Sequence, residues 1–142
     1  IVSIFITYVS PDGSEPKSSL ISFNEYVSVV EKKFEYFTSL DDTETLSKEN
    51  SYNIYDSVNR WNELLPVSRN QSGEIVEKGK NSRYQICMTT IKFLEKQRLV
   101  KLAGIDNKNI YIQDRLKAIL LNTYNSGYVQ NQIFDIIQKA GE

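Results

Sequence analysis

The hydrophobic pattern of the first residues predicts an extended segment, a turn and a return. Residues 1–9 are mainly apolar and are interrupted by Ser3 and Thr7, which is typical of a buried strand. The turn-forming run SPDGS at residues 10–14 follows, and residues 18–23 can then return as a second strand. We therefore expect a hairpin. A basic start and a small-residue cleavage site are missing, so a signal peptide is not predicted.

A long helix and a shorter one are predicted next. Ser22 can cap the long helix, and Glu25 has the capping-box spacing to reach back to it. Its apolar residues recur at three- and four-residue spacing: Tyr26, Val27, Val30, Phe34 and Phe37. Residues 40–50 are polar and acidic and are expected to form a loop, with one helical turn as the alternative. The shorter helix covers residues 56–65, ends at Pro66 and should bury Val58, Trp61, Leu64 and Leu65.

The segment from residue 81 onward has the most informative pattern. Asn81 or Ser82 can cap a helix over residues 82–97 that buries Tyr84, Cys87, Met88, Ile91 and Leu94. Two β-prone runs, residues 99–103 and 109–113, flank a five-residue loop of turn formers and predict a second hairpin. Helices are expected over residues 114–124 and 126–139. The predicted fold class is therefore α+β.

The order of these last elements resembles the winged helix-turn-helix superfamily. TTIKFLEKQRLVKL (residues 89–102) looks like the passage from recognition helix into wing, and NIYIQDRLKAIL (residues 109–120) looks like the exit from the wing. The resemblance covers residues 55–120. It implies that residues 82–97 lie in the major groove, that residues 99–113 form the wing, and that residues 67–80, which contain Gly73 and Gly79, supply the preceding helix. The chain is then one compact unit, residues 1–142, with an acidic strand-helix part (1–54) and a winged-helix-like part (55–142).

Charge is divided unevenly along the chain. The net charge is −1, but residues 1–77 hold six basic against thirteen acidic residues, whereas residues 78–117 hold ten basic against three acidic. A basic segment of this kind favours an anionic partner such as nucleic acid. The alternative is that the acidic part neutralises the basic part within one fold. The isoelectric point of 5.6 is low for a dedicated DNA-binding domain.

The resemblance makes the polar face of helix 82–97 a candidate recognition stripe. At about 100° per residue, four polar residues of this helix fall within about 60° of arc. Gln pairs with adenine, and Lys with guanine or phosphate. Basic residues of the wing and of the helix start would lie near phosphates. An ordinary solvated helix face is the alternative. The predicted nucleic-acid-binding residues are Arg83, Gln85, Thr89, Lys92, Lys96, Lys101 and Lys108.

The competing hypothesis is a protein-interaction subunit of a larger assembly, docked through the winged-helix-like part. DNA binding requires Lys92, Lys96 and Lys108 to be exposed and coplanar, whereas docking requires an exposed apolar patch of several hundred Å². Interface anchors would come from Tyr52, Tyr55, Tyr111, Tyr124 and Tyr128. The final predicted helix can pack on the domain or form a homodimer.

Enzymatic chemistry has little support. The chain has no histidine and a single cysteine, Cys87, which excludes histidine-based catalytic triads, internal disulfides and cysteine-cluster zinc sites. Glu31-Lys32-Lys33 and Glu77-Lys78-Gly79-Lys80 resemble a nuclease carboxylate-x-lysine element but have no convincing partner aspartate. A metal-dependent nuclease is therefore only the minor alternative. The acids Asp41, Asp42 and Glu44 are expected to be solvated, and no cofactor or metal is expected.

The expected setting is cytoplasmic and away from membranes. No apolar run approaches the ~20 residues that a bilayer-spanning helix needs. The first residue is not Met, so the chain is expected to be a fragment or a processed form.

Overall fold

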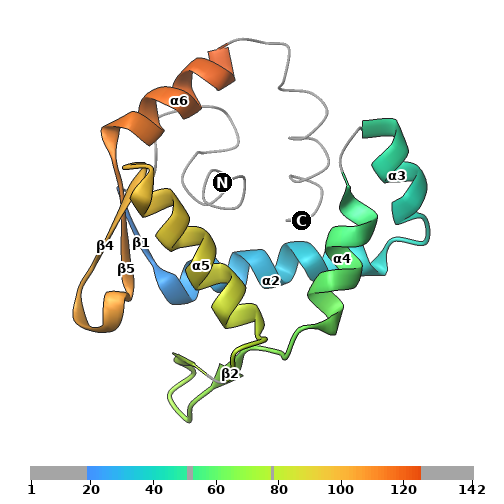
Figure 1. Cartoon of the computed structure of the whole chain (residues 1–142), viewed down its shortest axis with the longest axis horizontal. Coiled ribbons are helices and arrows are strands. Elements are labelled where there is room, and N and C mark those ends of the chain that lie inside the picture. The colour runs from blue at the N-terminus through green and yellow to red at the C-terminus, as the bar shows by residue number, and fades with distance from the viewer. Residues whose placement is uncertain (1–18, 51–52, 78, 126–142) are drawn as a thin grey trace.

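The computed structural model describes residues 19–50, 53–77 and 79–125 (Figure 1). Within these ranges the fold is α+β, as predicted, with five α-helices and two small antiparallel sheets. The elements are β1 (Leu20–Ser22), α2 (Phe23–Ser39), α3 (Thr43–Asn50), α4 (Ile54–Glu63), β2 (Ser68–Arg69), β3 (Ile75–Val76), α5 (Arg83–Lys96), β4 (Val100–Ala103), a 3₁₀ turn (Ile105–Asn107), β5 (Asn109–Ile112) and α6 (Asp114–Asn125). The strand predicted over residues 1–9 and the helix predicted over residues 126–139 lie outside these ranges. Among the described helices, none is long and apolar enough to cross a membrane.

Side-chain caps begin the two longest helices where the sequence predicts them. The Ser22 Oγ accepts a hydrogen bond from the Glu25 N–H at 3.1 Å at the start of α2. The Ser82 Oγ accepts from the Gln85 N–H at 3.2 Å at the start of α5. Each cap satisfies one backbone donor that the first helical turn leaves without a partner.

Two predictions about the middle of the chain are wrong. Residues 43–50 form the helix α3 rather than a loop, because Asp42 accepts a hydrogen bond from the Thr45 N–H at 2.9 Å and so acts as a cap. Leu65 was expected to be buried but is 55% exposed. It follows the end of α4, and its backbone N–H and C=O bond to Asn81 and Arg83 at 3.0 Å, which ties the end of α4 to the start of α5.

A small hairpin lies where the winged-helix resemblance required a helix. The strands β2 and β3 pair within residues 68–76, and the Asn70 side chain accepts from the Ser72 and Glu74 N–H groups. Gly73 supplies the positive φ of 78° that closes the turn. Residues 64–82 thus separate α4 from α5 without the tight turn of a helix-turn-helix.

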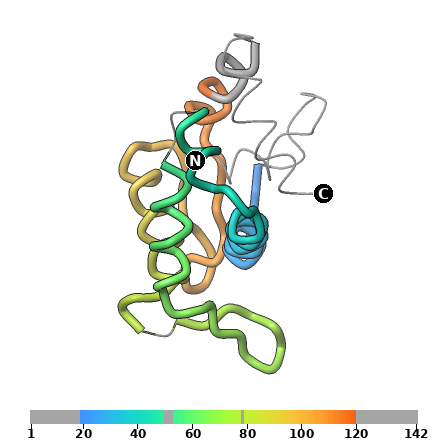
Figure 2. Tube along the Cα trace, turned by 90° about the vertical axis from the view of Figure 1, so that its right-hand side faces the viewer, coloured from blue at the N-terminus to red at the C-terminus, as the bar shows by residue number. Residues whose placement is uncertain are grey.

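The larger sheet joins the two ends of the described chain. β4 and β5 form the predicted hairpin, and β1 adds antiparallel to the far side of β5, which gives the order β1-β5-β4. In Figure 2, where α2 is seen nearly end-on, the β4–β5 hairpin lies between α2 and α5. A strand from the acidic part therefore pairs with a strand from the basic part.

One hydrophobic core spans both predicted parts of the chain. It includes Val27 and Val30 of α2 together with Ile91 and Leu94 of α5 and Ile110 of β5. The sequence pattern predicts a division at residue 54, whereas the packing is continuous across it.

Glu95 protects the edge of the larger sheet, and this leads to a first prediction. Its Oε1 accepts a hydrogen bond from the Leu102 N–H of the edge strand β4 at 2.9 Å. We expect Glu95→Ala to lower the free energy of unfolding by roughly 1.5–3 kcal/mol, the range for a hydrogen bond to a charged group. It should also speed hydrogen exchange at the Leu102 amide, since that donor then loses its partner. Urea denaturation and NMR exchange measure the two effects. Glu95→Gln keeps a hydrogen-bond acceptor, so it should lose less unfolding free energy and show slower exchange at the Leu102 amide than Glu95→Ala. Equal effects in the two variants would contradict a role for Glu95 in satisfying the Leu102 N–H.

Candidate nucleic-acid interface

The helix α5 presents the predicted recognition stripe on its outer side. Cys87, Met88, Ile91 and Leu94 are buried in the core, as predicted. Thr89, Lys92 and Lys96 are exposed, and Gln85 is half-buried. The amphipathic pattern therefore orients α5 as the sequence predicts, because the apolar face packs against the sheet and α2.

Three of the predicted residues line one groove. Gln85 and Lys92 of α5 and Lys108 of the β4–β5 loop border a hollow of about 450 Å³, which we call the wing groove. Asn24, Asn107 and Tyr84 add polar groups to its wall, and Glu77 and Asp106 add carboxylates. Burial, followed by the charges of Glu77 and Asp106, raises the pKa of Tyr84, so its phenol stays protonated at neutral pH. The groove thus carries hydrogen-bond donors from both the helix and the predicted wing.

The β4–β5 loop holds Lys108 through its backbone. The Phe23 N–H donates to the Lys108 carbonyl at 2.7 Å, which fastens the loop to the start of α2. Gly104 has a φ of 84°, and a Cβ there would stand 2.7 Å from the Asn109 amide nitrogen. The Lys108 ammonium lies 3.8 Å from Glu74 in an exposed pair, which is weak enough for the lysine to exchange partners.

Two predicted residues stand apart from the groove. Lys101 is exposed on β4 between the buried Val100 and Leu102, so it points to the face of the sheet opposite α5. Arg83 is engaged within the fold, because its Nε donates to the Trp61 carbonyl at 3.3 Å and its guanidinium lies 5.1 Å from the Trp61 ring centroid. Lys96 lies one helical turn beyond Lys92.

Two exposed apolar residues on the same helix are not among the predicted site residues. Ile86 is 48% exposed and Phe93 is 55% exposed. At about 100° per residue they lie roughly 140–160° from the buried Ile91, and that angle was the available signal. The outer side of α5 is therefore partly apolar.

A comparison with protein-family models identifies the family of this chain. The match covers residues 1–142. The chain belongs to DUF6063, a family of unknown function. No curated protein and no solved structure matches it.

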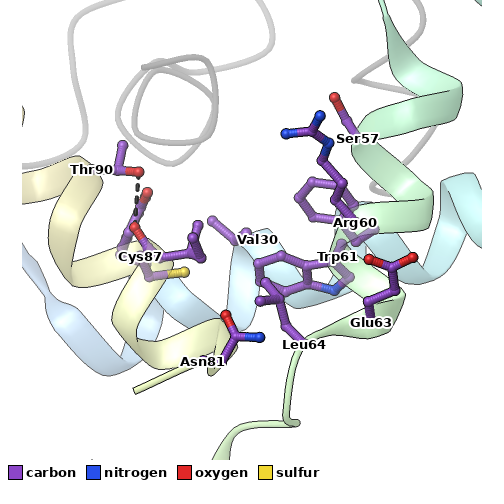
Figure 3. A pocket seen from close by; sticks show the side chains of 12 residues that line it. Val30, Ser57, Arg60, Trp61, Glu63, Leu64, Asn81, Cys87 and Thr90 are labelled. Carbon is purple, nitrogen blue, oxygen red and sulfur yellow. Dashed lines mark hydrogen bonds between the residues drawn. The ribbon is translucent and has the colours of Figure 1, made fainter. Parts of the chain in front are cut away.

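A second groove lies between α2, α4 and α5 and is more apolar (Figure 3). It has a volume of about 550 Å³ and is lined by Val30, Phe34, Trp61, Leu64 and Ile86, with Arg60 and Glu63 at α4. The Trp61 and Phe34 rings stack with centroids 4.3 Å apart. We call this the helix groove.

Two of the acids considered for metal or nuclease chemistry form ion pairs. Glu31 pairs with Arg69 at 2.8 Å, and Glu44 pairs with Lys48 at 2.8 Å. No group of three or more potential metal ligands occurs among the residues that the structure describes. Burial, and after it the charge of Glu31, raises the pKa of Cys87 to about 12, which favours the protonated thiol near neutral pH.

Proposed function

We propose that this chain is a non-enzymatic, winged-helix-like module that binds nucleic acid through α5 and the β4–β5 loop. The observation that carries the proposal is the wing groove, where Gln85 and Lys92 of the helix and Lys108 of the loop line the same hollow. Gln85 and Lys108, which are 23 positions apart in the chain, could thereby contact the same nucleic acid. Lys96 extends the basic stripe along α5.

The charge on α5 supports the proposal. Lys92 and Lys96 are exposed, whereas the only carboxylate of the helix, Glu95, is occupied by the Leu102 N–H. The exposed charged side chains of α5 are therefore both lysines, and they lie on the same helix as the exposed Ile86 and Phe93. Lysines that neutralise phosphates release condensed counterions, and this release is the main source of sequence-independent affinity.

An α-helix of this kind fits the major groove, where Gln85 and Thr89 can reach base edges and the lysines can reach guanine or phosphate. Lys108 would contact the backbone beside it. Arg83 and Lys101 are left out of the proposed surface, since one is engaged with Trp61 and the other lies on the far face of the sheet. The hairpin at residues 68–76 replaces the tight turn of the family resemblance, so α5 would dock without a close second helix.

The test is fluorescence anisotropy with a labelled random-sequence duplex. With about three phosphate contacts, affinity should fall roughly 40-fold between ~50 mM and ~200 mM salt. We expect Lys92→Glu/Lys96→Glu to weaken binding at least tenfold at the lower salt concentration and to reduce the salt slope by about two contacts.

The matched control is Lys48→Glu/Lys101→Glu, which changes the net charge equally but lies on α3 and on the far face of the sheet. It should bind within about threefold of the wild type, since screening weakens charges beyond a Debye length of about 10 Å. Equal loss in both double variants would show a general charge effect. No binding of the wild type at low salt would remove nucleic acid as the ligand.

A protein-interaction subunit is the second candidate function. It is favoured by Ile86 and Phe93, which are large, apolar and exposed on the same helix. Such residues are unusual on a surface that meets only phosphates and are typical of interface anchors.

A further inference from the structure

Ile86 and Phe93 form a short apolar ridge along α5. They are seven residues apart, so they lie about 20° apart around the helix and roughly 10 Å apart along it. Thr89 and Thr90 lie between them along the helix, and the Thr90 Oγ1 is bonded to the Ile86 carbonyl at 3.0 Å. The ridge is thus two large side chains separated by small ones.

The ridge continues into the helix groove. Ile86 and Thr90 line that groove together with Trp61 and Phe34. Thr90 and Trp61 are labelled in Figure 3. A partner side chain that packs against Ile86 therefore has an apolar hollow beside it. A row of apolar anchors with a groove alongside is the geometry by which folded domains receive an amphipathic helix.

The charges beside the ridge are all positive on α5. Lys96 lies about 60° from Phe93 around the helix axis, and Lys92 about 100°. Glu95 is the one carboxylate of α5, and it faces β4. A partner that covers the ridge meets two ammonium groups and no competing acid from the same helix.

We propose that the ridge binds an amphipathic helix of a partner protein whose apolar stripe is bordered by aspartate or glutamate. The apolar stripe packs on Ile86 and Phe93, and the bordering carboxylates reach Lys92 and Lys96. Charge complementarity selects this partner over a neutral or basic helix.

The partner helix and nucleic acid then compete for the same lysines. This part of the inference rests on the proposed function, because Lys92 and Lys96 are also the stripe that would contact phosphates. An acidic partner helix occupies these lysines and excludes the duplex. Partner binding therefore releases the nucleic acid from the module.

The test uses three fluorescein-labelled synthetic peptides of about 20 residues, above the length at which isolated helices become marginal. The first has leucines at positions i, i+3, i+4 and i+7 with flanking glutamates. The second has each glutamate replaced by lysine, and the third has each leucine replaced by serine. We expect only the first to bind the wild-type chain, as measured by anisotropy, and to displace an unlabelled duplex in competition.

Ile86→Ser/Phe93→Ser should weaken the first peptide at least tenfold and leave duplex affinity within about threefold, since serine keeps the lysines in place. Both residues are exposed, so the fold should persist, as circular dichroism can confirm. Ile105→Ser, at an 85% exposed isoleucine of the β4–β5 loop, is the control for removing an exposed isoleucine and should bind the peptide as the wild type does.

Several results would overturn the inference. Equal peptide binding by Ile86→Ser/Phe93→Ser, equal binding of the basic peptide, or no peptide binding at all would each do so. If sedimentation shows that the wild type self-associates and that Ile86→Ser/Phe93→Ser does not, the ridge binds a second copy of this chain. Loss of duplex binding in that variant would assign the ridge to nucleic acid. Peptide binding without any duplex binding would contradict the proposed nucleic-acid function but would still support the docking site.

Discussion

Trp61→Ala is expected to lower the free energy of unfolding by about 3–5 kcal/mol, the range for removing a large buried aromatic side chain. The Trp61 side chain is buried in the core, stacks on Phe34 of α2 and lies beneath the Arg83 guanidinium of α5. One side chain thus joins three helices. Its removal leaves a cavity at their junction and also takes away the cation–π contact.

Urea denaturation followed by circular dichroism measures this loss, since Trp61 is the only tryptophan and its fluorescence disappears with it. Tyr55→Ala is the control on the same helix, at a tyrosine that is 43% exposed, and should cost less than about 1 kcal/mol. An unchanged urea midpoint for Trp61→Ala would contradict the view that α4 is fixed to α5 through this ring. Because Arg83 then loses its aromatic partner, the N-terminal turn of α5 should also show faster hydrogen exchange.

Ile110→Ala is expected to lower the free energy of unfolding by about 2–5 kcal/mol, the range for truncating a buried isoleucine. Ile110 lies on the central strand β5, opposite Ile21 of β1 and Leu102 of β4, and it is fully buried. The variant therefore weakens the row of side chains that joins the acidic part of the chain to the predicted wing. Ile110→Val, which removes a single methylene, should cost about 0.5–1.5 kcal/mol.

Tyr111→Ala is the matched control, since Tyr111 is the next residue on the same strand but points to the exposed face of the sheet. It should cost less than about 1 kcal/mol, which is the span of strand propensities. Similar losses for Ile110→Ala and Tyr111→Ala would mean that the two faces of the sheet are not distinguished by packing. The Ile110→Val variant is expected to stay folded, so its duplex affinity tests whether loosening the sheet weakens binding through Lys108.

Several elements follow from short-range signals in the sequence. Ser22 and Ser82 begin helices because a serine hydroxyl satisfies a backbone donor three residues away. The inner face of α5 follows from the spacing of Cys87, Ile91 and Leu94. The helix at residues 43–50 was missed because its composition is polar, although its cap, Asp42, has the same spacing to Thr45 as the other caps have to their donors.

Other features depend on partners that are distant in the chain. The pairing of β1 with β5 joins residues about 90 positions apart, and no local pattern specifies it. Arginine commonly binds phosphates, which is why Arg83 was a predicted site residue. Its side chain instead donates a hydrogen bond to the carbonyl of Trp61, 22 residues earlier in the chain. Lys101 and Lys92 are both basic and exposed, but the sheet separates the side to which Lys101 points from α5.

Local patterns in the sequence were enough to predict the α+β class, the caps and inner faces of α2 and α5, and the β4–β5 hairpin. These depend on hydrogen bonds and periodicity within a few residues. Long-range packing brings Gln85, Lys92 and Lys108 to one groove, engages Arg83 with Trp61, and leaves Ile86 and Phe93 exposed. Those outcomes are set by which distant surfaces pack together, because burial and the choice of side-chain partners are properties of the packed chain rather than of its local segments.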